Sequence, residues 1–321
     1  MGRRAAVAIA LVALLLAVGA ADAYLDGLAR DNLSNATFPR THERTPWQMG
    51  LPSSNVTIPS DGLRLTGWWM PAPAGSANAS TTIVLVHGVS SQMGKPVRMW
   101  APMLHAAGYS LLAFDLRNHG ASPDAHGGLV TYGVDESRDV LAAAAWVRGN
   151  AAGLHVDPAR IVLYGMSMGA ASVLNAMGAD PPGVVAVVAD SPYASFRFQA
   201  HVDGARKGYP GWLVDLVVAK MDALAPSPPS ASRPDLALAA TATPVLLAQC
   251  SNDQRVTLPN QERLAAARHD SRERPPTVHT WAMPCGPGLS PDHHVDGAWQ
   301  PGYNATVLSF LRESQQVFLA L

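Results

Sequence analysis

The stretch RIVLYGMSMGAASVL, residues 160–174, constrains the fold more than any other part of the chain. Its apolar run predicts a buried strand, Gly165 and Gly169 flank Ser167, and a helix-like pattern follows. A serine between a strand and a helix sits in a strained tight turn that projects its Oγ out of the sheet. Side chains two residues to either side would collide there, so both positions need glycine. The pattern predicts that Ser167 is a nucleophile, with an ordinary tight turn as the alternative.

Strand-like and helix-like patterns alternate along most of the chain. The predicted strands are Ser54–Ile58, Leu63–Met70, Thr82–His87, Ser110–Asp115, Ile161–Gly165, Val184–Asp190, Val245–Cys250 and Val278–Met283. The predicted helices are Val97–Ala107, Asp135–Arg148, Ser167–Met177, Asn260–Arg268 and Tyr303–Ala320. Many of the strands are continuous apolar runs, which is typical of parallel strands buried on both faces. We therefore expect an α/β fold with a mainly parallel, eight-stranded sheet and helices on both faces.

One interval breaks this alternation. Residues 191–243 carry helical pattern, with Trp, Tyr and many prolines, but no strand pattern. An insertion of this length in a compact α/β domain is usually functional, so we interpret it as a small helical cap. A linker between domains is the alternative reading.

The N-terminus has the pattern of an export signal. Arg3 and Arg4 precede an apolar run from Ala5 to Ala21, and Ala23 ends an A-x-A-like site. This predicts that residues 1–23 are a signal peptide, with an uncleaved membrane anchor as the alternative. Residues 24–50 follow as a lead-in without strong periodicity. We expect a secreted or anchored protein whose domain, residues 24–321, lies outside the cytoplasm.

A nucleophilic serine needs a base, an acid that orients the base, and donors for the oxyanion. For a serine in this kind of turn, the acid and then the base follow along the chain. Asp253 stands just past a predicted strand and is the candidate acid, with Asp190 as its rival. The candidate base is His293 or His294, in the loop PDHHVDG before the last helix.

Two backbone amides are candidates for the oxyanion hole. One is the N–H of Met168, directly after the serine, and the other is the N–H of Val89, in the loop after an earlier strand. His87 precedes that loop and is interpreted as a structural residue, because a base should follow the nucleophile.

From about residue 50 to 320 the chain resembles the serine α/β-hydrolase family, especially exported bacterial esterase, lipase and dipeptidyl-peptidase-like members. The resemblance rests on the segments VLVHG, GYSLLAFDLRNHGAS, DPARIVLYGMSMG, ADSPYAS, VLLAQCSNDQRV and HVDGAWQPGYNATVLSFL, in that order. It implies the α/β-hydrolase fold, and its register at the end of the chain favours His294 over His293. Asn118, and the pair Cys250 and Ser251, depart from the family pattern.

The resemblance also bears on the two cysteines. In this fold the strands ending at Cys250 and near Cys285 would be adjacent and parallel, which brings both residues to one edge of the sheet. Neighbouring strands lie roughly 5 Å apart, within reach of a disulfide. We therefore expect this bridge, with two free thiols as the alternative.

The function expected is that of an exported serine hydrolase that cleaves small acyl esters through an acyl-enzyme, without metal or organic cofactor. A serine peptidase and a non-catalytic binding protein on the same fold are the alternatives. A metal hydrolase built on Asp292, His293, His294 and Asp296 is disfavoured, because adjacent residues seldom face one ion. The net charge of −1 gives no general attraction to nucleic acid. Membrane association is expected only through the N-terminal segment.

Overall fold

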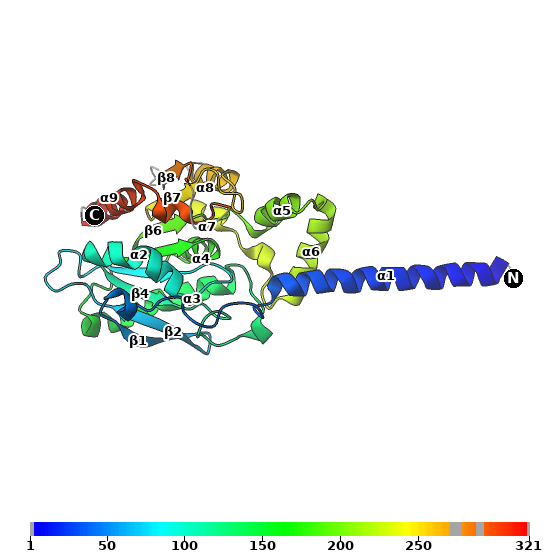
Figure 1. Cartoon of the computed structure of the whole chain (residues 1–321), viewed down its shortest axis with the longest axis horizontal. Helices are drawn as coiled ribbons and strands as arrows, with labels where there is room; N and C mark the ends of the chain where they lie inside the picture. The colour runs from blue at the N-terminus through cyan, green and yellow to red at the C-terminus, as the bar shows by residue number, and fades with distance from the viewer. Residues whose placement is uncertain (1–2, 270–277, 287–291, 320–321) are drawn as a thin grey trace.

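An eight-stranded sheet forms the centre of the molecule in a computed structural model that describes residues 3–269, 278–286 and 292–319 (Figure 1). The strands are β1 (Ser54–Ser60), β2 (Leu63–Met70), β3 (Thr82–Val86), β4 (Ser110–Phe114), β5 (Ile161–Met166), β6 (Val184–Asp190), β7 (Val245–Cys250) and β8 (Val278–Met283). Their order is β1-β2-β4-β3-β5-β6-β7-β8. Strand β2 is antiparallel to both neighbours, and the pairs from β4 to β8 are parallel. The predicted sheet is thus confirmed.

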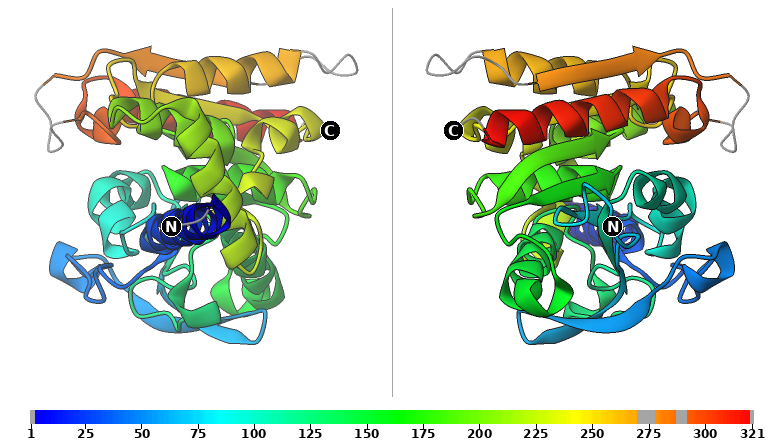
Figure 2. Two further views of the ribbon diagram at one scale, coloured as in Figure 1. Left: turned by 90° about the vertical axis from the view of Figure 1, so that its right-hand side faces the viewer. Right: turned by 90° about the vertical axis from the view of Figure 1, so that its left-hand side faces the viewer.

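Helices cover both faces of the sheet, as the continuous apolar strands predicted (Figure 2). The helices of the body are α2 (Gly94–Ala106), α3 (Asp135–Leu154), α4 (Met168–Met177), α8 (Pro259–His269) and α9 (Tyr303–Leu319). Successive strand residues point to opposite faces. Leu85 of β3 accordingly belongs to an apolar cluster with Trp100 of α2 and Phe310 of α9. Its neighbour Val84 belongs to a second cluster with Val140 of α3.

The last strand, β8, differs from the other late strands in its exposure. It lies at the edge of the sheet and pairs only with β7. Trp281 is buried, whereas His279, Thr280 and Met283 are exposed. An apolar run alone does not distinguish an edge strand from a central one, because exposure is decided by the neighbours that the fold supplies.

The insertion between β6 and β7 is helical, but its helices serve two different layers. They are α5 (Phe196–Arg206), α6 (Gly211–Leu224) and α7 (Pro234–Ala240). Helices α5 and α6 pack on each other and stand beyond the end of the sheet (Figure 1). Helix α7 instead packs against α4 and α8 of the body. Short 3-10 helices are η1 (Trp47–Met49), η2 (His126–Gly128), η3 (Pro229–Ala231) and η4 (Asp296–Trp299).

The N-terminal helix α1 (Arg3–Leu33) projects away from the body and meets it only at its C-terminal end (Figure 1). Ala29 and Leu33 are buried there in an apolar cluster with side chains of α6. The first part of the expected lead-in, residues 24–33, thus continues the N-terminal helix, although its sequence shows no strong periodicity. A short segment gains its helical stability mainly from tertiary packing, which a local pattern does not reveal.

Ion pairs add to the contact between α1 and α6, the longer of the two helices, α5 and α6, that form the cap. Lys220 of α6 lies 2.6 Å from Asp22 and 3.0 Å from Asp26. Over the described part of the chain, no helix combines the length and the apolar character needed to cross a membrane. The role of residues 1–23 as signal or anchor stays a prediction.

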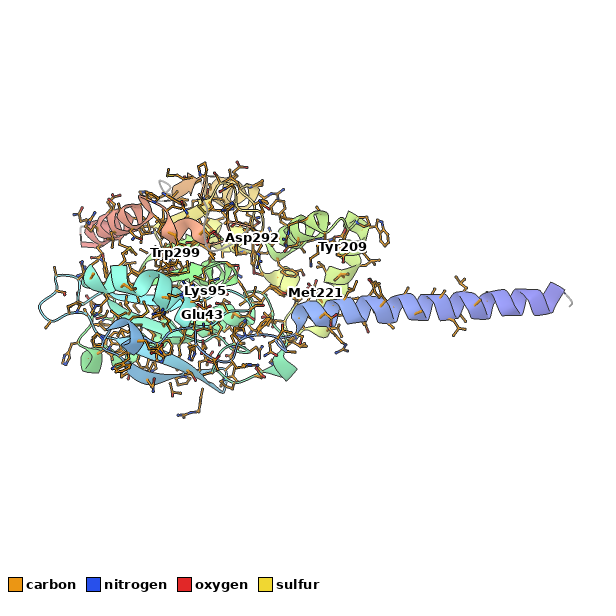
Figure 3. The ribbon with its side chains drawn as sticks, in the orientation of Figure 1. Glu43, Lys95, Tyr209, Met221, Asp292 and Trp299 are labelled. Atoms are coloured by element: carbon orange, nitrogen blue, oxygen red, sulfur yellow. A yellow bond between two sulfur atoms is a disulfide. The ribbon has the colours of Figure 1, made fainter. Side chains whose placement is uncertain are left out.

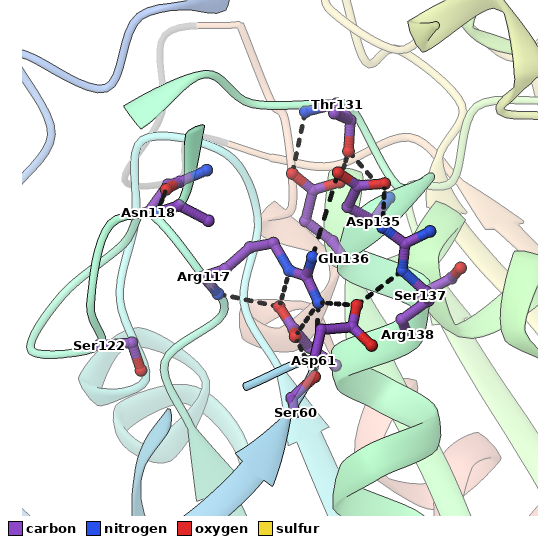
Figure 4. Close-up of polar contacts among 12 residues, drawn as sticks. Ser60, Asp61, Arg117, Asn118, Ser122, Thr131, Asp135, Glu136, Ser137 and Arg138 are labelled. Carbon is purple, nitrogen blue, oxygen red and sulfur yellow. Dashed lines mark hydrogen bonds and ion pairs between the residues drawn. The ribbon is translucent and has the colours of Figure 1, made fainter. Parts of the chain in front are cut away.

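A buried arginine holds the edge of the sheet to α3. Arg117, just after β4, donates from Nη2 to Asp139 Oδ1 at 2.7 Å and from Nε to Asp139 Oδ2 at 2.9 Å (Figure 4). Both side chains are almost fully buried. Ser60 donates to the same carboxylate at 2.6 Å, and Asp61 accepts from Arg117 at 2.9 Å. This network joins the β1–β2 turn, the end of β4 and α3.

We predict that Asp139→Ala destabilises the protein strongly, because it leaves the Arg117 guanidinium buried without its main partner. Loss of one member of a buried pair costs about 3–5 kcal/mol, measured here by urea denaturation. The control is Arg40→Ala, whose ion pair with Asp124 is half-exposed on both sides and should contribute at most about 1 kcal/mol. Equal effects of the two variants would contradict the role given to this pair.

Candidate active site

Ser167 occupies the turn between β5 and α4 with φ 53° and ψ −122°. A left-handed φ is uncommon for a residue with a side chain, and here the surroundings enforce it. A Cβ at Gly165 would overlap the carbonyl oxygen of Gly169, and one at Gly169 would overlap that of His87. The Ser167 amide donates to the Asp190 carbonyl at 2.8 Å. The two glycines therefore permit the tight turn that the motif predicted.

The side chains of Ser167, His294 and Asp253 form a continuous hydrogen-bonded line. The distance from His294 Nε2 to Ser167 Oγ is 2.9 Å, and that from His294 Nδ1 to Asp253 Oδ2 is 2.8 Å. An ionised carboxylate only accepts hydrogen bonds, so Nδ1 carries the proton in this arrangement. The bare Nε2 then accepts from the serine hydroxyl, as a general base must.

The backbone after β7 holds the Asp253 carboxylate in place. Its Oδ1 accepts the amides of Arg255 and Val256 at 2.8 and 2.9 Å. Its Oδ2 is thereby left to His294, and the side chain is fully buried. Asp253 and His294 are the residues that the sequence placed first as acid and base, and the structure brings them together with Ser167.

Several bonds tie the Asp253 loop to the His294 loop. The expected disulfide between Cys250 and Cys285 is present, with a Cα–Cα distance of 5.4 Å. Asn252 pairs with the backbone of Cys285 in both directions, at 2.8 and 3.0 Å. Arg255 forms an ion pair with Asp292 at 3.0 Å. The Asn252 contact was not predicted, because a polar loop residue beside the acid carries no distinctive signal.

The alternative base makes different contacts from His294. His293 has a left-handed φ of 55°, and its Nδ1 lies 4.0 Å from Asp296. Both contacts to the serine and the acid belong to His294. Among residues 3–269, 278–286 and 292–319, no group of three or more His, Cys, Asp and Glu side chains is placed to hold a metal ion.

The alternative acid, Asp190, is engaged elsewhere. Its Oδ2 accepts the hydroxyl of Tyr303 at 2.5 Å, and its Oδ1 accepts that of Ser191 at 2.9 Å. Tyr164 lies 2.7 Å from the Tyr303 oxygen and completes a buried chain. Burial raises the pKa of Asp190 to about 6, and the two hydroxyl donors oppose that rise. Asp190 thus anchors the start of α9, the helix that follows the His294 loop.

The two candidate oxyanion donors border the same space as Ser167. Val89 and Met168 line one cavity together with the serine. The loop that carries Val89 is held by His87, which is fully buried. His87 Nε2 accepts the amide of Leu116 at 3.0 Å, and Nδ1 faces the Gly88 carbonyl at 2.8 Å. The position of His87 fits the structural role expected for it.

That cavity has a volume of about 220 Å³ and lies between Ser167 and the cap. Its walls are mostly apolar and come from α1, α5, α6 and the loops of the sheet, with Tyr209 and Met221 on the cap side (Figure 3). Two lining residues, Leu28 and Asn32, belong to α1 and were not anticipated. Their spacing of four residues on one helical face is the only signal the sequence offers.

The sequence model of the Alpha/beta hydrolase family matches residues 83–309. The chain belongs to the alpha/beta hydrolase family. The predicted resemblance is confirmed, and the molecule has the fold of a hydrolase of this family.

Two relatives of this alpha/beta hydrolase are the uncharacterized proteins YfhR of Escherichia coli K12 and Rv2307c of Mycobacterium tuberculosis H37Rv. Their identities to it are 34% and 31%, over 46% and 45% of this chain. The chain spans about half, 50%, of the length of each.

Solved structures of other alpha/beta hydrolases share the fold. The Pyrococcus furiosus esterase Pf2001 has a TM-score of 0.67 and 22% identity, covering 88% of this chain and 98% of its own. The Pyrococcus horikoshii acylaminoacyl peptidase has a TM-score of 0.56 and 16% identity, covering 74% of this chain and 37% of its own. The Porphyromonas gingivalis dipeptidyl peptidase 4 has a TM-score of 0.59 and 19% identity, with coverages of 84% and 35%.

We predict that the disulfide of this alpha/beta hydrolase stabilises the fold and the site together. The bridge closes a loop with a sequence separation of 35, which the chain-entropy model values at about 3–4 kcal/mol. The double variant Cys250→Ala, Cys285→Ala should lose about that much in urea denaturation. Dithiothreitol should destabilise the wild type and leave the double variant unchanged. Two reactive thiols in the denatured, unreduced wild type would contradict the bridge.

Proposed function

We propose that the chain is a serine hydrolase that cleaves carboxylic esters through an acyl-enzyme. The observation that carries the proposal is the hydrogen-bonded line from Asp253 through His294 to Ser167, which opens on an apolar cavity. The carboxylate, imidazole and hydroxyl have the order, spacing and tautomer that nucleophilic catalysis by serine requires.

In the first half of the reaction, Ser167 Oγ attacks the ester carbonyl carbon while His294 Nε2 takes the hydroxyl proton. The tetrahedral intermediate collapses, the carbon–oxygen bond to the alcohol breaks, and the imidazolium returns its proton to the departing oxygen. In the second half, a water attacks the acyl-enzyme with the same proton transfers. Asp253 orients the imidazole and stabilises its positive charge throughout.

The amides of Val89 and Met168 are the proposed donors to the oxyanion. Met168 is the first residue of α4, so its N–H is one of those that a helix start leaves without a partner inside the helix. Gly88 lies directly against Ser167, because a Cβ there would meet the serine Cβ at 3.1 Å. This close approach supports the placement of the Val89 amide beside the reacting carbon.

Peptide cleavage is the alternative reaction on the same residues. It is supported by the structural neighbours that are acylaminoacyl and dipeptidyl peptidases, whose likeness to this chain is one of fold. Peptidases that act on a free amino terminus, such as dipeptidyl peptidases, need a site for the substrate's ammonium group, and the cavity is bordered by one carboxylate, Asp203, within the described residues. Arg206 already pairs with Asp203 at 3.2 Å, which favours esters. A non-catalytic binding protein is disfavoured by the complete hydrogen-bonded line.

We also propose that the protein is exported and acts outside the cytoplasm on small-molecule esters. A disulfide within one domain is characteristic of oxidising compartments, and the basic, apolar N-terminus supports export. Attachment to a membrane would run through the N-terminal segment, as an uncleaved anchor.

We predict that Ser167→Ala and His294→Ala each reduce kcat for ester hydrolysis by about 10³-fold or more, because these groups act as a unit. His293→Ala, the matched control in the same loop, should stay within about threefold of the wild type. Labelling by a fluorophosphonate probe should be lost in Ser167→Ala and retained in His293→Ala. A wild type that resists the probe in its folded state would contradict the proposed nucleophile.

We predict that acyl esters are hydrolysed in preference to aminoacyl amides. The measurement is kcat/KM for p-nitrophenyl esters beside the aminoacyl p-nitroanilides of alanine and Gly-Pro. We expect the ester values to be higher by about 10²-fold or more, since no built site for an ammonium group borders the cavity in the described residues. Higher values for the anilides would establish the peptidase alternative.

A further inference from the structure

We propose that the cavity beside Ser167 binds one aliphatic chain of the substrate, and that the N-terminal helix α1 forms a wall that limits the length of this chain. The inference rests on the proposed function, since it assigns the substrate class of the same site. It gives α1 a part in substrate selection in addition to any part in export or attachment.

The lining of the cavity suits an uncharged, flexible chain. Its apolar residues come from α1, α5 and α6 and from the loop after β3. Examples are Leu28, Val89, Phe196, Leu213, Val217 and Met221. A cavity of about 220 Å³ has room for a chain of several carbons. Longer chains must displace a wall or extend into solvent.

The charged residues at the cavity do not select an ionic substrate. Asp203 contributes a negative charge, and Lys207 and Arg255 contribute positive ones. Arg255 is paired with Asp292, and Asp203 with Arg206. The remaining cation, Lys207, is exposed to solvent, which screens its charge, so the apolar surface dominates recognition.

Helix α1 is fastened at this point rather than lying loosely against the cap. The Tyr132 hydroxyl donates to the backbone carbonyl of Asn32 at 2.6 Å. Just beyond the helix, Ser34 pairs with Leu129 in an antiparallel β-bridge. Ala29 and Leu33 are buried in an apolar cluster with side chains of α6. The residues directly before them, Leu28 and Asn32, line the cavity. The ion pairs of Lys220 hold the preceding turns.

The test uses Leu28→Trp in the full chain, with p-nitrophenyl esters from acetate to dodecanoate as probes. A larger side chain at this wall should lower the ratio of kcat/KM for octanoate to that for acetate by about 10-fold or more. The matched control is Gly27→Trp, which places the same side chain on the same helix where a Cβ meets nothing within 4 Å. That ratio should not change in the control.

A second variant tests from another helix whether this cavity holds the acyl chain. Val217→Trp narrows the same cavity from α6, and it should lower the octanoate-to-acetate ratio as well. A ratio that falls for Val217→Trp but is unchanged for Leu28→Trp would show that the chain lies elsewhere than against α1, and would overturn the proposal. An unchanged ratio in both variants would do the same.

Failure of the proposed function is separately visible. If the wild type hydrolyses no ester, calorimetric titration of Ser167→Ala with 1-octanol still reports on the cavity. Octanol binding that is weakened about 10-fold or more by adding Leu28→Trp, but not by adding Gly27→Trp, would sustain the α1 wall. Octanol binding that is absent or insensitive to Leu28→Trp would overturn it.

Discussion

The site depends first on the backbone conformation at Ser167. A left-handed φ at a residue with a side chain costs of order 1–3 kcal/mol, and it persists only where the surroundings over-determine it. Gly165 and Gly169 supply the room, and the Asp190 carbonyl holds the serine amide at 2.8 Å. Because β5 lies in the middle of a parallel sheet, the turn lifts the hydroxyl to the edge where the other strands also end. A different turn would take the Ser167 hydroxyl away from His294 and Asp253.

Loops must reach that hydroxyl with sub-ångström precision, and each is held by bonds that have no part in chemistry. His87 links the loop after β3 to the loop after β4 through the Leu116 amide. The disulfide and Asn252 join the acid loop to the base loop. Behind them the Asp190–Tyr303 hydrogen bond fixes the start of α9. An arrangement of side chains built on loops needs such support, because loops are otherwise the most mobile parts of a fold.

Apolar runs predicted the strands well because a parallel sheet buries both faces of its strands, so local composition carries the signal. They could not predict the exposure of β8, which follows from its place at the edge. The sequence narrowed the candidate base to two adjacent histidines and separated them only through resemblance, since which of the two reaches Ser167 is a matter of loop conformation. Asp190 and Asp253 both lie at the ends of strands, so the sequence alone does not distinguish them. In the structure Asp190 accepts a hydrogen bond from Tyr303, and Asp253 contacts His294. The helical extension of α1 to Leu33 was missed because its stability comes from the cap.

That extension changes what the N-terminal segment means for the molecule. One continuous helix carries the apolar N-terminal run and, about one and a half to two and a half turns beyond Ala23, the residues that border the cavity. Cleavage after Ala23 would remove Asp22 from the Lys220 pair while leaving Asp26, Leu28 and Asn32 in place. An uncleaved helix would keep both ion pairs of Lys220. The N-terminal run and the residues that border the cavity therefore belong to one secondary-structure element. Under the proposals that this run is an export signal or anchor and that α1 limits the substrate chain, location and specificity would depend on the same helix.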